Sequence, residues 1–413
     1  SVIEAREVVV DSPEGEALVA GDGREAELYR TVRAVVEEHA DEIRSRYPDL
    51  KRCVSGYNLH EVVYENEAGE RCVNLAKLLV GSEGTLGVVV EATLELVTRP
   101  EETALVLLAY DSLDAAMRAV PPALDAAASA VELMDDEVFR LAADSAEYAE
   151  YVTDVPEDTA AVLLVEFDSE LHDDLAGAVE AATERFVGKG EAFAAVPALG
   201  ADEQARLWKL RKAAIPLLMS MEGDPKPYPF IEDASVPPEA LASYVAAFEA
   251  VLDDHDTSAA YFAHAGAGTL HVRPVLNLKT EAGVEAMRSI ADDVTDLVLE
   301  HHGAFSGEHG DGLARTEFNP KMYGPDLWDA FKRVKSAFDP DWLMNPGKVV
   351  YRDDDPTDVR EHLRYGADYA TVEPATVQSF DDEGGFGHLV ELCNGCGTCR
   401  QTGSEVMCPT YRA

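Results

Sequence analysis

The spacing of apolar residues along the first hundred positions predicts one long helix and, further on, a strand. In the segment 24–47 these residues recur at helical intervals on one face, and the helix is expected to stop before Pro48. The residues of this face are Leu28, Val32, Val35, Val36 and Ile43. The run 88–96 is rich in β-branched residues and ends at Arg99-Pro100, which predicts a strand. We therefore place the first structural boundary near residue 100.

Between residues 101 and 335, short β runs alternate with helices that are rich in Ala and acidic residues. The clearest β runs are 104–110, 160–167 and 230–236. The main helices are expected at 112–128, 171–187, 238–253 and 281–301. This alternation predicts an α/β or α+β layer in which helices cover one face of a sheet.

The end of the chain differs in character from the part before it. Residues 352–386 are acidic and contain scattered Pro and a Gly pair, as is typical of a linker. Four of the six cysteines follow, as Cys393, Cys396, Cys399 and Cys408. The Cys-x2-Cys-x2-Cys spacing of the first three, with a later Cys408-Pro409, matches the ligand pattern of bacterial [4Fe–4S] proteins. Zinc is the alternative, and the Cys-Pro ending favours iron–sulfur.

The charge balance narrows the classes of partner. The chain has 79 acidic and 34 basic residues, a formal net charge of -45, and the acidic residues are spread over the predicted helices. That distribution favours a solvated surface adapted to high salt, and it excludes nucleic acid and anionic membranes as direct partners. Clustered cysteines without a secretion signal indicate a reducing cytoplasm, here one of high salt. The start, Ser1-Val2-Ile3-Glu4, lacks Met and soon enters a strand-like run, so we expect an internal fragment.

Two histidine motifs are the strongest candidates for chemistry. His264 and His271 flank a turn with two glycines, which could bring both imidazoles to one side as ligands of a divalent metal. For an arbitrary pair, two unrelated histidines beside a turn would be the better interpretation. A second cluster, Glu308-His309 between glycines, adds a carboxylate and a third imidazole. A His/His/Glu metal site with a neighbouring His base is therefore chemically coherent.

Two further features give weaker signals. Arg211 and Lys226 are basic residues in an acidic protein, and an Arg can bind a carboxylate through two parallel hydrogen bonds. Basic residues on a helix are nevertheless usually solvated. The segment Gly81-Ser82-Glu83-Gly84-Thr85-Leu86-Gly87 lacks the spacing of a dinucleotide-binding motif, so a simple turn is a serious alternative.

Six motifs in collinear order resemble the FAD-linked oxidases of the vanillyl-alcohol-oxidase superfamily. The similarity is greatest to D-lactate, glycolate and D-2-hydroxyglutarate dehydrogenases fused to a [4Fe–4S] ferredoxin-like domain. The motifs are Gly56-Tyr57-Asn58-Leu59, Gly81 to Gly87, Trp208-x-x-Arg211, His264 to His271, Gly307-Glu308-His309-Gly310 and Asn345-Pro346-Gly347-Lys348.

The resemblance implies an α+β fold with a division into domains. Residues 1–100 would form the C-terminal half of an FAD-binding domain. Residues 101–340 would form a ferredoxin-like substrate or cap domain, with an antiparallel sheet covered by helices. Residues 341–355 would return to the flavin site, 356–388 would be a linker, and 389–413 would begin the iron–sulfur domain.

The resemblance also assigns roles to particular residues. It implies a divalent metal, with zinc favoured, on His264, His271 and Glu308, and His309 as the catalytic base. Arg211 and Lys226 would bind the substrate carboxylate. The residues expected at the FAD site are Gly56, Tyr57, Gly81, Ser82, Glu83, Gly84, Gly87 and Asn345. The residues expected to ligate iron–sulfur clusters are Cys393, Cys396, Cys399 and Cys408.

The expected reaction is oxidation of a D-2-hydroxy acid to the 2-oxo acid, with electrons passing through [4Fe–4S] clusters to a quinone or another redox carrier. Such a carrier would be compatible with peripheral attachment to the inner face of the membrane. Ile215 stands where some relatives have a polar substrate contact, and Arg273 where some have Asn. Ile215 favours a D-lactate or glycolate type over the hydroxyglutarate type. The alternatives are a zinc hydrolase built on the His/His/Glu site and a non-catalytic iron–sulfur electron-transfer subunit.

Overall fold

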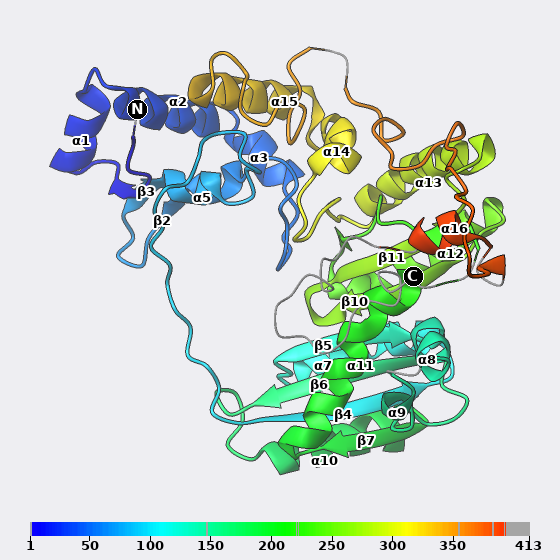
Figure 1. The fold of residues 1–413 in the computed structure, drawn as a ribbon. Helices are drawn as coiled ribbons and strands as arrows, with labels where there is room; N and C mark the ends of the chain where they lie inside the picture. The colour runs from blue at the N-terminus through cyan, green and yellow to red at the C-terminus, as the bar shows by residue number, and fades with distance from the viewer. Residues whose placement is uncertain are drawn as a thin grey trace.

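An antiparallel sheet forms the centre of the larger lobe of the molecule (Figure 1). The computed structural model describes residues 2–145, 148–219, 221, 223–353, 356–381, 384–391 and 393. The strand order is β7-β4-β6-β5-β10-β11-β8, and β9 also pairs with β11. The strands are β4 (Thr103–Tyr110), β5 (Ala130–Asp135), β6 (Ala161–Asp168), β7 (Ala194–Ala198), β8 (Lys226–Pro227), β9 (Ala234–Ser235), β10 (Ala259–His264) and β11 (Thr269–Leu276). Of the β run expected at 230–236, only β9 is a strand.

The predicted α+β class is confirmed, but helices cover both faces of this sheet and not one face as expected. Alternation along β4 sends Leu105 and Leu107 to one face, where α11 (Ala201–Met219) and α8 (Asp136–Ala143) cover them. Val106 and Leu108 point to the other face and join a larger core. The helices on that side are α6 (Leu113–Arg118), α7 (Val120–Asp125), α10 (Leu175–Thr183), α12 (Leu241–Asp254) and α13 (Glu281–Glu300). Helices are thus found at all four predicted positions, the first as the pair α6 and α7; α9 (Ala149–Val152) is an additional short helix.

A smaller N-terminal lobe contains a three-stranded sheet of order β1-β3-β2. Its elements are β1 (Glu7–Val9), α1 (Pro13–Ala20), α2 (Arg24–Glu38), α3 (Ala40–Arg46), α4 (Leu59–Val62), β2 (Val63–Glu65), β3 (Arg71–Asn74) and α5 (Leu75–Leu79). The single helix expected at 24–47 is two helices, because the backbone at His39 leaves helical geometry (φ −110°, ψ 23°). The five apolar residues of the expected face are all buried, as predicted.

A later segment of the chain returns to this lobe. The helix α15 (Asn319–Phe338), which follows α14 (Gly312–Arg315), lies along α2 in Figure 1. Lys335 on α15 is buried and donates to the Thr85 carbonyl at 2.6 Å, to Asp339 at 2.8 Å and to the Met344 carbonyl at 2.7 Å. The helix α15, which ends just before the expected domain boundary at 340, thus already packs against the N-terminal lobe.

The strand expected at 88–96 is absent from the structure. This segment runs from the N-terminal lobe to β4 without regular structure (Figure 1), and none of the described strands pairs with it. Its large apolar side chains are exposed, at 82% for Val88, 78% for Leu94 and 94% for Leu96. The prediction was wrong because β-branched composition favours a strand only where a neighbouring strand is available for pairing.

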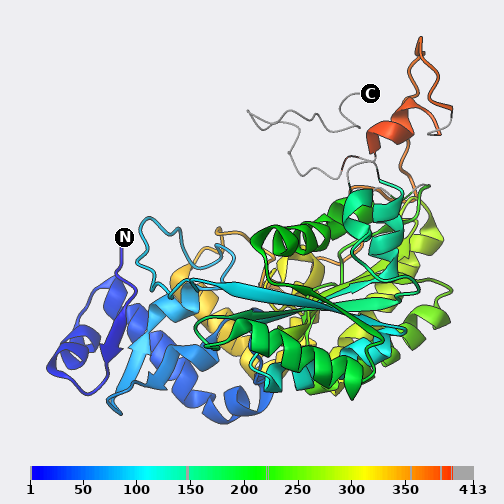
Figure 2. The same cartoon turned by 90° about the horizontal axis from the view of Figure 1, so that it is seen from below.

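The C-terminal segment is only partly a linker. Val359 and Tyr365 are buried against the rest of the molecule, whereas residues 370–379 are exposed. A short helix, α16 (Phe386–Glu391), follows, and Figure 2 shows this end of the chain projecting from the main body. Of the predicted cluster ligands only Cys393 is described, and it is exposed; Cys396, Cys399 and Cys408 lie outside the described residues. None of the described helices combines the length and the apolar character needed to cross a membrane.

Candidate active site

One face of the main sheet carries a group of charged residues on the neighbouring strands β5, β10 and β11. In the antiparallel register, Phe262 on β10 lies opposite both Met134 on β5 and His271 on β11. Because side chains alternate along each strand, Glu132, His264, His271 and Arg273 share the face that α11 covers. The helix contributes Arg211, whose Nε donates to Glu132 at 3.1 Å. A buried sheet face therefore collects two guanidinium groups, a carboxylate and two imidazoles.

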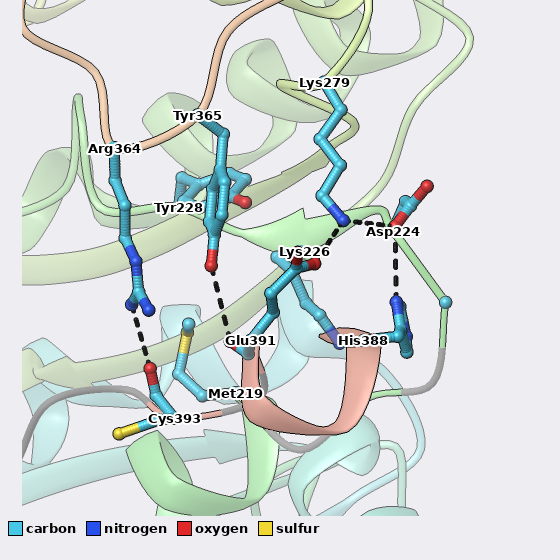
Figure 3. A pocket seen from close by; sticks show the side chains of 11 residues that line it. Met219, Asp224, Lys226, Tyr228, Lys279, Arg364, Tyr365, His388, Glu391 and Cys393 are labelled. Carbon is cyan, nitrogen blue, oxygen red and sulfur yellow. Dashed lines mark hydrogen bonds and ion pairs between the residues drawn. The ribbon is translucent and has the colours of Figure 1, made fainter. Parts of the chain in front are cut away.

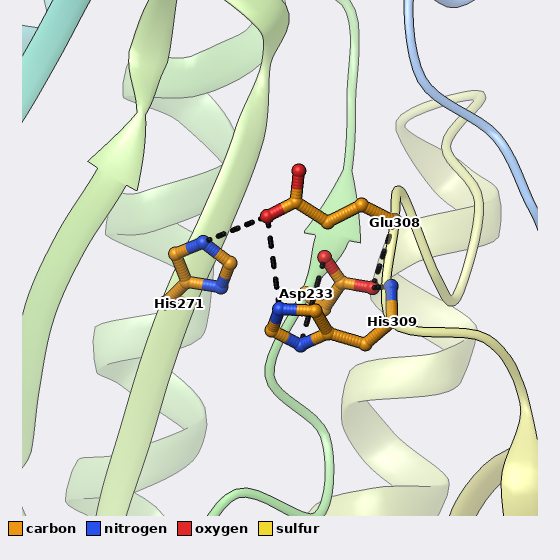
Figure 4. A group of neighbouring side chains, drawn as sticks. All are labelled: Asp233, His271, Glu308 and His309. Atoms are coloured by element: carbon orange, nitrogen blue, oxygen red, sulfur yellow. Dashed lines mark hydrogen bonds and ion pairs between the residues drawn. The ribbon is translucent and has the colours of Figure 1, made fainter. Parts of the chain in front are cut away.

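The predicted histidines and Glu308 meet at one point. The Nε2 atoms of His264, His271 and His309 lie 3.3, 3.6 and 3.6 Å from the same oxygen, Glu308 Oε1. Figure 4 shows His271, Glu308 and His309 turned toward one another, with Asp233 beside them. The structure thus brings together the three predicted metal ligands and the predicted base, which come from segments more than 30 positions apart.

Two buried glutamates hold the opposite sides of these imidazoles. His264 Nδ1 donates to Glu132 at 2.9 Å, and His309 Nδ1 donates to Glu232 Oε1 at 2.8 Å. His271 Nδ1 lies 3.5 Å from Glu232 Oε2, close but outside hydrogen-bond geometry. Hydrogen bonding of Nδ1 leaves Nε2 as the ring atom that faces Glu308.

Sequence reasoning missed both glutamates, although a local signal was present. Glu132 lies within the apolar strand Ala-Val-Glu-Leu-Met-Asp, and Glu232 within Phe-Ile-Glu-Asp-Ala-Ser. Both are buried, at 8% and 5% exposure. An acidic residue at an inward position of an apolar run is rarely buried without a partner, and that pattern marks such residues as candidates.

The electrostatics of the site follow from these contacts. Burial raises the pKa of Glu232, but the contacts with His271 and His309 and the charge of Arg273 outweigh it and lower that pKa well below its ordinary value. The hydrogen bond to Glu232 raises the pKa of His309. His309 is also the most open of the three imidazoles, with 42% of its side chain exposed against 4% for His271. A substrate could therefore reach His309.

Asp233 shapes the loop that carries Glu308 and His309. Its Oδ2 accepts from Ser306 Oγ at 2.6 Å and from the amides of Glu308 at 3.1 Å and His309 at 2.8 Å. Gly310 continues this loop with φ +86°, and a Cβ there would lie 2.7 Å from Glu83 Oε1. The loop is thus fixed on one side by Asp233 and is tightly packed on the other by Glu83.

Two of the residues expected at the FAD site, Gly56 and Tyr57, make packing contacts in the core. Tyr57 is fully buried against Phe331, and its hydroxyl lies 2.8 Å from Thr85 Oγ1. A Cβ on Gly56 would meet the rings of Phe331 and Tyr323 at 2.7 Å, so its close approach is to the core. Both residues are buried in this arrangement.

The Gly81 to Gly87 loop divides into a tied part and an open part. Ser82 is buried and donates to the Leu79 carbonyl at 2.8 Å. The Glu83 carboxylate accepts from the amides of Asp311 and Gly312, at 2.6 and 3.0 Å, so it links the two lobes. A Cβ on Gly81 would make an ordinary van der Waals contact with Val54, at 3.7 Å. Open space surrounds Gly84 and Gly87, and the exposed Asn345 donates to the Glu83 carbonyl. Gly84 and Asn345 are thus exposed, and Gly87 is half-buried.

Lys226 lies apart from the histidines. Its strand β8 pairs with the far end of β11 at Leu276, five positions beyond His271, which corresponds to roughly 17 Å along a strand. Its Nζ donates to the Met221 carbonyl. Lys226 therefore lies near the opposite end of β11 from the histidine cluster.

Lys226 instead lines a cavity of about 60 Å³ near the C-terminal helix (Figure 3). Asp224, His388 and Glu391 converge there and could hold a metal by their chemistry. However, Lys279 Nζ is hydrogen-bonded to Asp224 at 2.8 Å and also to Glu391. The ammonium group already occupies the position of a cation between these carboxylates.

The histidine cluster, by contrast, fits a divalent metal. Asp233, His271, Glu308 and His309 each offer one ligand atom within 4.8 Å of the others, a group that differs from the predicted ligands by containing Asp233 and His309 and lacking His264. Ligands at about 2.0–2.2 Å from a tetrahedral zinc are separated by roughly 3.4 Å, and His264 Nε2 and His271 Nε2 lie 3.3 and 3.6 Å from Glu308 Oε1. Asp233 Oδ1 is buried and has no hydrogen-bond partner among the described residues. Imidazole nitrogen with carboxylate oxygen is a donor set that zinc and other first-row metals accept.

Comparison with known proteins places the chain in a family. Residues 99–349 match the family described as FAD linked oxidases, C-terminal domain. The chain is 34% identical to a D-2-hydroxyglutarate dehydrogenase of Pseudomonas putida, over 98% of this chain and 40% of that protein. It is 37% identical to the enzyme of the same name from Escherichia coli K12, over 78% of this chain and 32% of that protein. It is also 30% identical to the glycolate oxidase subunit GlcD of Bacillus subtilis, over 68% of this chain and 58% of that protein.

The relatives carry the names of more than one substrate type. Ile215 is 42% exposed, whereas Arg211, on the same helix, is buried. The chain spans less than half the length of the D-2-hydroxyglutarate dehydrogenases that it matches. On the identity and coverage of these matches, this chain belongs to the FAD-linked oxidase family, and residues 99–349 are its C-terminal domain.

Proposed function

We propose that the protein is an FAD-dependent dehydrogenase that oxidises a D-2-hydroxy acid to the corresponding 2-oxo acid. The observation that carries the proposal is the convergence of three imidazole Nε2 atoms on Glu308 beside the buried Arg211. Relatives named D-2-hydroxyglutarate dehydrogenase, D-lactate dehydrogenase and glycolate oxidase support it. D-2-Hydroxyglutarate is the first substrate to test, followed by D-lactate and glycolate.

Different residues of this site would bind the substrate carboxylate and a divalent metal. Arg211 would bind the substrate carboxylate through its Nη2. Its Nε already donates to Glu132 Oε2, whereas Nη2, 2.9 Å from that oxygen, lies outside hydrogen-bond geometry and has no hydrogen-bond partner among the described residues. His264, His271 and Glu308 would hold a divalent metal. Such a metal, when bound, supplies a Lewis acid for the hydroxyl group, and the flavin, when bound, supplies the two-electron acceptor.

His309 would act as the general base for the substrate hydroxyl. Its Nδ1 is hydrogen-bonded to Glu232, its Nε2 faces Glu308, and its side chain is open to solvent. A base whose other nitrogen is held by a carboxylate has a defined direction and a fixed tautomer.

We further propose that electrons leave through a [4Fe–4S] cluster bound by Cys393, Cys396 and Cys399, with Cys408 available to a second cluster, and reach a quinone or another carrier. Support comes from the cysteine spacing alone.

The proposal is tested by the absorption spectrum of the full-length protein without oxygen. Addition of a D-2-hydroxy acid should bleach the flavin band, and the L-enantiomer should not. Removal of the metal with a chelator should abolish this bleaching, and added zinc or manganese should restore it. A colourless protein that binds zinc and hydrolyses substrates would contradict the proposal and support the hydrolase alternative.

Replacement of His309 by Ala is expected to lower turnover by about 10²- to 10⁴-fold, the usual contribution of a general base. Flavin absorbance should remain, because His309 lies on the substrate side of the site. His255→Ala is the matched control, since His255 is paired with Asp293 on the outer surface. Normal turnover in His309→Ala would exclude this residue as the base.

A further inference from the structure

A chain of three residues leads from a buried arginine to the predicted base. Arg273 Nη2 donates to Glu232 Oε2 at 3.1 Å, and His309 Nδ1 donates to Glu232 Oε1 at 2.8 Å. The Arg273 and Glu232 side chains are only 7% and 6% exposed. The two oxygens of one carboxylate therefore serve two different donors.

Arg273 is fixed in this position. Its guanidinium lies over the ring of Phe262, 5.5 Å from the centroid, and its Nε has no hydrogen-bond partner among the described residues. A buried guanidinium with few acceptors requires the one that it has, because an unpaired buried charge is costly. Glu232 Oε2 is thus committed to Arg273, and Oε1 is the oxygen left for His309.

A similar chain, Arg211–Glu132–His264, lies nearby and serves as an internal comparison. Arg211 Nε donates to Glu132 Oε2, and His264 Nδ1 donates to Glu132 Oε1 at 2.9 Å. His264 Nδ1 also lies 3.0 Å from Oε2, so it can use either oxygen. His309 has a single close acceptor, because Asp233 Oδ1 is 4.0 Å away.

We propose that Glu232, oriented by Arg273, is a positioning residue for His309: it keeps the imidazole proton on Nδ1 and so leaves Nε2 free to accept a proton. This inference rests on the proposed function only for its effect on turnover. The tautomer itself is a property of the protein without substrate or metal.

The replacement Glu232→Gln tests this role because an amide has only one acceptor. Arg273 will take the amide oxygen, so the NH2 group will face His309 Nδ1. His309 must then accept at Nδ1 and carry its proton on Nε2, the reverse of the tautomer in the native protein. In enzymes with a catalytic triad, the same exchange of a carboxylate for an amide lowers kcat by about 10⁴-fold through the wrong tautomer.

The direct readout is a long-range ¹H–¹⁵N spectrum of the metal-free full chain labelled with ¹⁵N-histidine, recorded well above the ordinary pKa of histidine. His309→Asn identifies the signal. We expect Nδ1–H in the native protein and Nε2–H in Glu232→Gln. The double variant Glu232→Gln/Arg273→Met should regain an Nδ1–H population, because the amide can then turn its oxygen to His309. Glu132→Gln should alter the His264 signal and leave that of His309 unchanged.

Several results would overturn the proposal. An Nε2–H signal for His309 in the native protein would do so without any variant, even if Glu232→Gln failed to fold. An unchanged tautomer in Glu232→Gln would exclude Glu232, and a double variant identical to Glu232→Gln would exclude Arg273.

Kinetics separate this inference from the proposed function. In Glu232→Gln, kcat should fall by about 10²- to 10⁴-fold while KM changes little, because the change affects proton transfer and leaves Arg211 in place. If the native protein oxidises no D-2-hydroxy acid but the tautomer reverses as expected, the proposed function fails and the positioning role stands. If the native protein is active and Glu232→Gln retains full kcat, the positioning role fails alone.

Discussion

At the scale of single residues, buried carboxylates account for most of the order around the histidines. Glu132 and Glu232 each connect an arginine to an imidazole, and Asp233 fixes the loop that carries the third imidazole. A buried charge is tolerated when it is paired and hydrogen-bonded, and these contacts provide both conditions. Positional accuracy at the site therefore comes from residues that touch neither substrate nor metal in the proposed mechanism.

Asp135 is a buried carboxylate of a different kind, since it has no cationic partner among the described residues. Its Oδ2 accepts from the Tyr261 amide at 2.6 Å, and its Oδ1 accepts from the Val138 amide at 3.4 Å at the start of α8. Burial raises the pKa of Asp135 to about 7. The folded protein therefore holds this proton to a higher pH than the unfolded chain does, in which Asp titrates near 3.9.

The stabilising contribution of the Asp135 proton is complete below about pH 4 and is lost as the pH rises through about 7. Asp135→Asn cannot titrate and should lack this loss. Urea unfolding at pH 5 and pH 8 should show that the native protein loses stability relative to Asp135→Asn over this interval. A difference in unfolding free energy that is equal at both pH values would show that Asp135 is not the group responsible.

At the scale of elements, α15 is tied through Lys335 to the Thr85 loop of the N-terminal lobe and to the segment that follows the helix. This ammonium group has three partners, in the loop at Thr85, at Asp339 and at Met344, and it is 1% exposed. The same helix packs on α2, so one element connects the expected flavin-site loop to the core of the N-terminal lobe.

Lys335→Met is expected to lower the free energy of unfolding by about 3–5 kcal/mol, because it leaves the buried Asp339 without its counter-ion. Arg333→Met on the same helix is the control; its partner Glu38 is exposed, and its loss should matter little. Urea denaturation of both variants measures the effect. Equal and small losses would mean that the Lys335 contacts do not stabilise the fold.

The same scale shows what could be predicted from the sequence. Glycine-flanked histidines predicted the cluster, because short motifs with local turns fix which side chains face the same way. Glu132 and Glu232 could not be found in this manner, since Glu132 lies 132 positions from His264 in sequence and meets it only through the pairing of β5 with β10. The predicted strand at 88–96 failed for a related reason: an apolar pattern does not specify the partner that would pair with it. The position of Lys226 could not be predicted either, because the number of residues between Arg211 and Lys226 does not specify the path of the chain from α11 to β8.

At the scale of the whole molecule, the net charge of -45 sets the conditions under which the fold is stable. Repulsion between surface carboxylates opposes compaction, and its range falls from about 10 Å at 0.1 M salt to about 3 Å at 1 M.

The temperature of unfolding should therefore rise strongly between 0.1 M and 2 M KCl, as followed by circular dichroism. Sucrose at matched osmolality is the control, since it does not screen charge. An equal rise in sucrose would indicate a general effect of solvent exclusion and would contradict an electrostatic origin.

The extended segment 88–97 has a consequence for how this polypeptide behaves in solution. Six of its side chains, three of them the consecutive Val88, Val89 and Val90, are apolar and open to solvent, and its backbone is unpaired. Such a segment is a template for strand addition between molecules, and so for aggregation during expression and refolding. Glu91 and Glu95 interrupt the run and act as gatekeepers against stacking of identical segments. The part of this chain that resembles a strand is thus also the part from which insoluble material would grow.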